Sequence, residues 1–447
     1  MSTKHIIVKV DQAETIDLAL PDGQQFTVVS LDQGDDNRMM RSPILADLEK
    51  KNMVLNDTMS DLLNFALGLY TVDQTVSRSQ NGFQGWSRHL VVYCAVHDVA
   101  LWDGVKEDLE NYIGFLSGDK WNFNFRKHSL DREVTIDQDN RNPENYTKVC
   151  LLSGGLDSFI GAIDLLVADS EKPFFVSHYK TGTESSAQEK ILEGLTTKFG
   201  ADHFSSHRFY VQPNQKHVNA QKENSSRARS LLFICLGLAV ANALGDNIPL
   251  ILPENGLISL NIPLTKTRLS SHSTRTTHPY FVDGLNRIFG KLGIGNRIIN
   301  PYRFKTKGEM MVDCMDREFL TIHVKETVSC SHPENSRYAG KTPGLNCGYC
   351  VPCIIRQSAE KKFGEITTTY ALENIQKNPP AQNTKTGADY RAFKIALEKL
   401  DGISARHSLA LQISRSGPIP YENTESIDEY ISVYQRGMQE VKDFLNS

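Results

Sequence analysis

The segment KVCLLSGGLDS, residues 148–158, leads from an apolar run through two adjacent glycines into the start of an amphipathic run. Adjacent glycines let the backbone turn tightly and approach a ligand closely. The N–H groups of such a turn, together with those of a helix start, bind anions such as phosphate. The segment therefore predicts a strand over 148–152, an anion-binding loop over 153–158 and a helix over 157–166. The alternative is an ordinary strand–turn–helix junction in which a serine or the aspartate caps the helix.

Outward from this loop, short apolar runs alternate with helical patterns at a spacing of roughly 30 residues, which is typical of βαβ units. We expect an α/β fold with a parallel sheet and helices on both of its faces. The expected strands are 148–152, 174–176, 209–211 and 250–252, and the expected helices are 157–166, 187–199 and 227–244.

The chain of 447 residues is long enough for two or three domains. A polar stretch over 137–145 indicates a boundary. We expect an N-terminal α+β domain over 1–145, the α/β domain over 146–365 and a helical extension over 366–447. The front region has expected strands at 6–10, 26–29 and 89–93 and a helix at 57–70, and the extension has helices at 392–400 and 427–444.

Composition excludes several classes of protein. Lys and Arg number 49 against 53 Asp and Glu, a net charge of -4, so overall charge does not indicate a nucleic-acid partner. No apolar run reaches the roughly 18–20 residues that span a bilayer, and the apolar run at 6–8 is too short for a signal peptide. We therefore expect a cytoplasmic protein without a membrane partner.

Four of the eight cysteines gather in one stretch, as Cys330, Cys347, Cys350 and Cys353. In a reducing compartment such a cluster favours a metal over disulfides, and four thiolates suit tetrahedral Zn2+. An iron–sulfur cluster and unliganded thiols are the alternatives.

The sequence Ser-Gly-Gly-Leu-Asp-Ser at 153–158 resembles the PP-loop of the ATP pyrophosphatases. This resemblance implies cleavage of ATP between the α- and β-phosphates, transfer of AMP to a substrate oxygen and attack by a nitrogen or sulfur nucleophile. It also implies an adenine-nucleotide α-hydrolase-like fold. The loop followed by the four cysteines is similar to the QueC family, the 7-cyano-7-deazaguanine synthases, which adenylate 7-carboxy-7-deazaguanine and add ammonia.

The added front and tail regions are most similar in layout to the QatC proteins of the Qat anti-phage defence system. In such relatives the resemblance implies that an amine of a partner protein replaces ammonia as the nucleophile. The implied cofactors are ATP, Mg2+ and Zn2+.

The candidate site residues fall into three groups besides the cysteine ligands. The catalytic candidates are Asp157, Ser158 and Lys307, where Lys307 belongs to a Thr-Lys-x-Glu element and would neutralise charge on the phosphates. The nucleotide-binding candidates are Leu152, Ser153, Gly154, Gly155, Leu156, Asp157, Ser158, Arg227 and Arg229. The substrate candidates are Glu254 and Asn255, at the carboxyl end of a strand, and Arg268.

Two other functions stay open on sequence alone. PP-loop enzymes also transfer sulfur to tRNA, using a catalytic cysteine or an iron–sulfur cluster. A non-catalytic scaffold that binds deazapurines or partner proteins is the third possibility, although a scaffold has no need of a pyrophosphate cradle.

Overall fold

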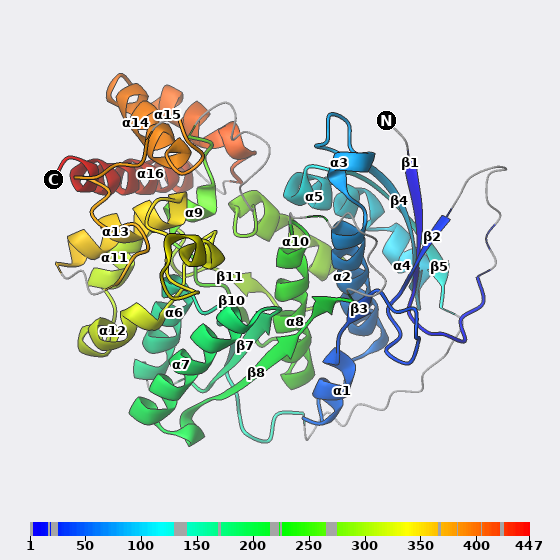
Figure 1. Ribbon diagram of the computed structural model, residues 1–447. Coiled ribbons are helices and arrows are strands. Elements are labelled where there is room, and N and C mark those ends of the chain that lie inside the picture. Colours follow the sequence, from blue (N-terminus) through cyan, green and yellow to red (C-terminus); the bar gives the residue numbers. More distant parts are fainter. Residues whose placement is uncertain are drawn as a thin grey trace.

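The computed structural model describes residues 3–16, 18, 26–128, 141–168, 171–214, 223, 226–264, 275–364, 368–381, 383–403, 405–420 and 424–447. Figure 1 shows a sheet at each side of a group of central helices, with the C-terminal helices stacked beyond the second sheet. Among the described residues, no helix is both long and apolar enough to cross a membrane.

The central sheet has five parallel strands in the order β11-β10-β6-β7-β8. Side chains along β6 and at Leu152, which follows it, point alternately to the two faces of the sheet. Val149 and Leu151 therefore enter one core, and Cys150 and Leu152 enter another. This confirms the expected α/β architecture of a parallel sheet flanked by helices. The strands are β6 (Lys148–Leu151), β7 (Pro173–Tyr179), β8 (Ser205–Tyr210), β10 (Leu250–Ile251) and β11 (Ile298–Ile299).

Each face of this sheet is covered by helices that follow its strands. One face carries α6 (Leu156–Val167), α7 (Gly182–Phe199), α11 (Lys307–Val312) and α12 (Arg317–His323), and the other carries α8 (Arg229–Leu244) and α10 (Pro279–Lys291). The carboxyl ends of β6 and β10 consequently meet at one edge, where the chain turns into α6 and α9 (Gly256–Leu260).

The front region corrects the expected α+β domain. Its four strands are parallel, in the order β2-β1-β4-β5, so the region is α/β as well. Parallel strands need long crossovers, and the connections from β2 to β4 over 31–88 and from β4 to β5 over 97–119 contain helices. The elements are β1 (Thr3–Lys9), β2 (Phe26–Ser30), α2 (Asp57–Thr75), β4 (His89–Val96), α5 (Lys106–Ser117) and β5 (Lys120–Lys127).

The front region and the central sheet share one hydrophobic core. Helix α2 is buried along most of its length and packs against α8, so the two helices lie side by side between the sheets (Figure 1). A short antiparallel pair of β3 (Met40–Arg41) and β9 (Gln212–Pro213) adds a second connection. The apolar pattern of α2 extends around the helix, as expected for a helix that is buried on all sides.

The C-terminal region forms a further core. Helices α13 (Val351–Phe363), α14 (Ala388–Asp401), α15 (Arg406–Ile413) and α16 (Thr424–Leu445) pack together with α9. In Figure 1, α16 (red) runs beside α13 and α11 (yellow), and the three are in contact. The remaining short elements are α1 (Ile44–Glu49), α3 (Arg78–Asn81), α4 (Val99–Asp103), η2 (Ala201–His203), η4 (Val324–Glu326), η5 (Pro333–Ala339) and η6 (Ser414–Ser416).

Candidate functional site

The loop after β6 forms a tight turn that ends in a helix start. Gly154 has φ of +87°, a conformation that favours glycine, and Gly155 is the N-cap residue of α6. The Ser153 Oγ accepts the Gly155 N–H at 3.3 Å and lies 3.1 Å from the Ser158 Oγ. Among the described residues, no acceptor is hydrogen bonded to the N–H groups of Asp157 and Ser158. These donors, at the positive end of α6, suit an anion.

Residues 328 and 329, which precede the first cysteine of the cluster, hydrogen bond to this loop. The Val328 N–H donates to the Gly154 carbonyl at 2.9 Å, and the Ser329 Oγ accepts the Leu156 N–H at 3.0 Å. The two segments are in van der Waals contact here, since a Cβ on Gly155 would lie 3.4 Å from the Ser329 Oγ. The position of the loop therefore depends on the segment that leads to Cys330.

Asp157 is the centre of a buried polar cluster. Its Oδ1 forms an ion pair with the Lys307 ammonium, and its Oδ2 accepts the Asn255 N–H at 3.1 Å and the Asn255 side-chain amide at 2.7 Å. The same amide donates to the Glu254 carboxyl at 3.2 Å. Four candidate residues from three separate segments thus meet at the carboxyl edge of the sheet.

The pKa values of the two acids in this cluster, Asp157 and Glu254, shift in opposite directions. Burial favours the neutral form of Asp157, but the Lys307 ammonium and the hydrogen bonds outweigh it and lower the pKa of Asp157 to about 2. Burial and the neighbouring Asp157 charge raise the pKa of Glu254 well above its usual value. Asp157 is therefore the more acidic of the two carboxyl groups, and Glu254 is the one that keeps a proton more readily.

Arg229 reaches the loop through an intermediate layer. Its Nε donates to the His178 Nδ1 at 3.1 Å, and its Nη1 pairs with Glu184 at 2.6 Å. Burial, followed by the Arg229 charge, lowers the pKa of His178 to about 3, so a neutral imidazole accepts this bond. The Gln188 side-chain amide then connects the His178 carbonyl, at 3.2 Å, with the Ser153 carbonyl, at 3.4 Å.

Arg227 faces the front region. Its Nη1 donates to the Ser117 carbonyl at 2.5 Å, and its guanidinium lies 5.0 Å from the Trp86 ring centre. Burial, followed by the nearby Arg78 charge, lowers the pKa of Arg227 to about 10. The role expected for Arg227 in nucleotide binding stays a prediction, and the substrate candidate Arg268 lies outside the described residues.

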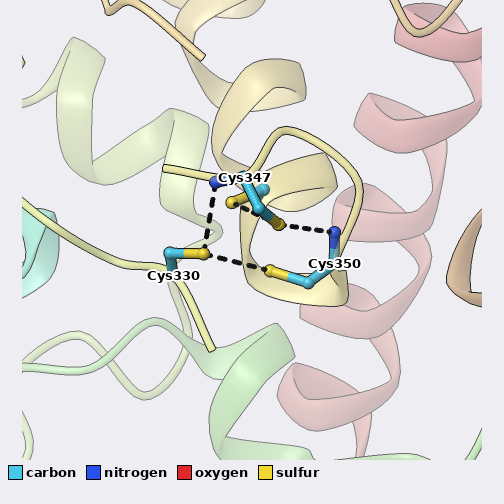
Figure 2. A group of neighbouring side chains, drawn as sticks. Cys330, Cys347 and Cys350 are labelled. Carbon is cyan, nitrogen blue, oxygen red and sulfur yellow. Dashed lines mark hydrogen bonds between the residues drawn. The ribbon is translucent and has the colours of Figure 1, made fainter. Parts of the chain in front are cut away.

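The four expected cysteine ligands come together, including Cys330 across its long gap. Their sulfur atoms all lie within 4.8 Å of one another, with Cys330 Sγ to Cys350 Sγ at 3.9 Å and Cys347 Sγ to Cys353 Sγ at 3.8 Å. Figure 2 shows Cys330 beside the turn that carries Cys347 and Cys350. The backbone N–H groups of His332 and Cys347 both donate to the Cys330 sulfur at 3.2 Å.

This donor set fits zinc. A tetrahedron with Zn–S bonds of about 2.3 Å has edges of about 3.8 Å, close to the sulfur–sulfur distances of 3.8 Å and 3.9 Å given above. An iron–sulfur cluster places iron and sulfide ions between its cysteines and needs a wider spacing. Three of the four cysteines are buried and the fourth is partly buried, as in a closed structural site.

The cysteines outside this cluster are core residues. Burial raises the pKa of Cys94 and of Cys314 to about 12, and it raises the pKa of Cys150 and Cys235 as well. Each is therefore a neutral thiol at physiological pH, which is a weak nucleophile.

Sequence reasoning missed several residues that support the site. Gln188, Ser329 and Glu440 carry no local motif, because their partners come from distant segments. A signal existed for α11, where Thr306 and Glu309 form a capping box that sets the first helical residue, Lys307. Comparison of the sequence with family models and with curated proteins gives no match.

Proposed function

We propose that this chain is an ATP-dependent adenylating enzyme of the PP-loop type, similar to the QueC enzymes. The observation that carries the proposal is the glycine loop at the start of α6, with Asp157 held against Lys307 behind it. An anion-binding turn, an ionised acid and a buried ammonium at one sheet edge are the groups that pyrophosphate release from ATP needs.

Each candidate residue has a distinct role in this proposed reaction. Ser153, Gly154, Gly155, Leu156 and Ser158 bind the phosphates that leave as pyrophosphate. Asp157, with Glu254 after its proton is lost, would hold Mg2+, which shields the charge of the phosphates. Lys307 then exchanges part of its contact with Asp157 for a phosphate oxygen and stabilises the charge that develops on it. Arg229 orients the nucleotide through the His178 and Gln188 layer.

The acceptor of AMP is a carboxylate of the 7-carboxy-7-deazaguanine type, bound beside Glu254 and Asn255. Adenylation turns a poor leaving group into a good one, so a nitrogen nucleophile then displaces AMP and forms an amide. The nucleophile is ammonia or an amine of a partner protein, and we propose a role in anti-phage defence for the second case. The cysteine cluster would hold Zn2+ as a structural ion, which suits a reducing compartment such as the cytoplasm.

Sulfur transfer to tRNA is less favoured by the same observations. The neutral, buried thiols outside the cluster are poor sulfur carriers, and the cluster spacing fits one zinc ion better than iron and sulfide. A binding scaffold would leave the buried Asp157–Lys307 pair without a purpose, since an apolar pair of similar volume is often at least as stable.

Pyrophosphate release from ATP, with and without 7-carboxy-7-deazaguanine, tests the proposal. Release that depends on the acid, with a new amide or nitrile in the mass spectrum, supports it. Pyrophosphate release in the absence of any carboxylate argues for another acceptor of AMP. The same holds if 7-carboxy-7-deazaguanine gives no release with either ammonia or a partner protein as the nucleophile. Stoichiometric zinc in colourless protein supports the structural metal, whereas brown protein with broad visible absorbance indicates an iron–sulfur cluster.

A further inference from the structure

The last helix of the chain contacts three elements that carry the candidate site. Helix α16 packs against α9, which starts directly after Asn255, against α11, which starts at Lys307, and against α13, which starts between two of the cysteine ligands. These contacts are close. A Cβ on Gly256 would lie 2.9 Å from the Val433 side chain, and a Cβ on Gly437 would lie 2.9 Å from the Leu257 side chain.

The polar part of this contact centres on Glu440, which is only 9% exposed. Its Oε1 accepts the Thr306 hydroxyl, and its Oε2 accepts the Gly308 N–H at 3.3 Å. Lys362 pairs with the same carboxylate at 2.8 Å. Thr306 and Gly308 are the residues on either side of Lys307, so one carboxylate fixes the backbone that carries the ammonium.

Arg436, one turn earlier on α16, holds the other side of the α11 start. It pairs with Glu309 at 2.6 Å and donates to the Phe304 carbonyl at 2.8 Å. Glu309 is the residue that closes the capping box on Thr306. Residues 304–309 are therefore held at both ends by α16.

We infer that Glu440 is a positioning residue for Lys307. Through Glu440, helix α16 would fix the position of the Lys307 ammonium in the proposed nucleotide site. The inference rests on the proposed function for its catalytic consequence. Lys307 has a long side chain that must place its ammonium against both Asp157 and a phosphate. A displacement of its backbone by about 1 Å moves that charge away and can slow the reaction up to ~100-fold.

The test compares Glu440→Ala and Glu440→Gln with Glu429→Ala, a matched control at an exposed glutamate of the same helix. Each full-length variant is assayed for pyrophosphate release well below its Tm, and its zinc content is measured. We expect Glu440→Ala to lower kcat roughly ten- to a hundredfold while KM for ATP changes much less. Glu440→Gln keeps an oxygen for the Thr306 hydroxyl and should recover part of kcat, and Glu429→Ala should match the wild type.

Hydrogen exchange identifies the cause. The N–H groups of α11 should exchange at least tenfold faster in Glu440→Ala, while those of β4 and β5 keep their protection. Faster exchange throughout the chain, with loss of zinc, would overturn the inference in favour of a general stabilising role. An unchanged kcat, or an unchanged α11, would overturn it as well.

The reactivity of the Lys307 amine reports its position without depending on catalysis. If the wild type releases no pyrophosphate, an amine-reactive reagent still tests the position of Lys307. Mass spectrometry measures the rate at which the reagent labels this residue. Labelling that is at least tenfold faster in Glu440→Ala supports positioning, and equal labelling rejects it.

Discussion

Lys307 and Asp157 form an ion pair across 150 residues of sequence, with only 4% and 7% of their side chains exposed. The pair connects the start of α11 to the start of α6, so the ammonium lies at the first turn of the helix that follows the glycine loop. A buried charge needs a partner, and each of these residues is the partner of the other. Their separate roles in stability and in activity can therefore be tested one at a time.

Lys307→Met should remove the proposed phosphate contact and lower pyrophosphate release by roughly 10²–10³-fold. The change also leaves Asp157 buried without its cation, which should destabilise the protein by about 3–5 kcal/mol. Denaturant unfolding and a pyrophosphate assay measure the two effects. Lys305→Met, at a half-exposed lysine that pairs with Asp313, should change both by little.

The double variant Asp157→Asn/Lys307→Met separates stability from activity. It removes both charges, so much of the lost stability should return, whereas pyrophosphate release should stay at or below the level of Lys307→Met because the proposed Mg2+ ligand is lost as well. Recovery of activity together with stability would mean that the pair only supports the fold.

Local patterns predicted the framework but not these contacts. The loop over 153–158 and the strand before it were predictable, because two glycines and an apolar run act over a few residues. The α+β expectation for the front region was wrong, because short apolar runs do not reveal whether neighbouring strands run parallel. The approach of Lys307 to Asp157, and of Glu440 to Thr306, depends on packing between distant helices and leaves no local signal.

The pH dependence of stability should reflect the two neighbouring acids Asp157 and Glu254, whose pKa values shift in opposite directions. Because the pKa of Asp157 is lowered to about 2 from 3.8, its contribution is complete above about pH 4 and is lost as pH falls through 2. Because the pKa of Glu254 is raised, the folded state keeps a proton that the unfolded state releases near 4.5. Its contribution is complete below that pH and is lost as pH rises toward the folded pKa.

Glu254→Gln should therefore remove the decline on the alkaline side and make the protein more stable than the wild type at neutral pH. Urea unfolding across pH, in buffer without added divalent cation, measures this. Glu193→Gln, at an exposed glutamate of α7, is the control and should follow the wild type. A parallel loss of Mg2+-dependent activity in Glu254→Gln would fit its proposed role. If both variants gave the wild-type curve, Glu254 would be ionised in the free protein.

Gly154→Ala should damage the loop more than the fold. At φ of +87° an L-residue costs about 1–2 kcal/mol, and the new Cβ would lie 3.3 Å from the Gln188 side chain. Relief of this strain must move the loop, so we expect ATP affinity, measured by calorimetry, to fall by at least tenfold. Gly182→Ala, at the first position of α7 with no atom within 4 Å, should leave affinity unchanged. Equal affinity in both variants would exclude the loop from the binding site.

Loss of the metal should loosen the glycine loop, because residues 328 and 329 connect the loop to Cys330. Cys353→Ser should leave three thiols and remove most of the bound zinc, because a closed site needs all four ligands. Residues 328 and 329, which hold Gly154 and Leu156, stand next to Cys330 and should lose their fixed position. We expect faster hydrogen exchange at residues 154–158 and a lower ATP affinity.

Two further variants separate this coupling from a general loss of stability. Cys94→Ala removes a buried thiol of the front core and should keep both zinc and loop protection at some cost in stability. Ser329→Ala keeps the metal but removes the acceptor of the Leu156 N–H, so it should reproduce part of the loop effect with full zinc content. If Cys353→Ser lost zinc while the loop kept its protection and its ATP affinity, the metal would stabilise only the region around the cysteines. A loop effect in both Cys353→Ser and Ser329→Ala, absent from Cys94→Ala, would establish that the metal-bound segment holds the loop in place.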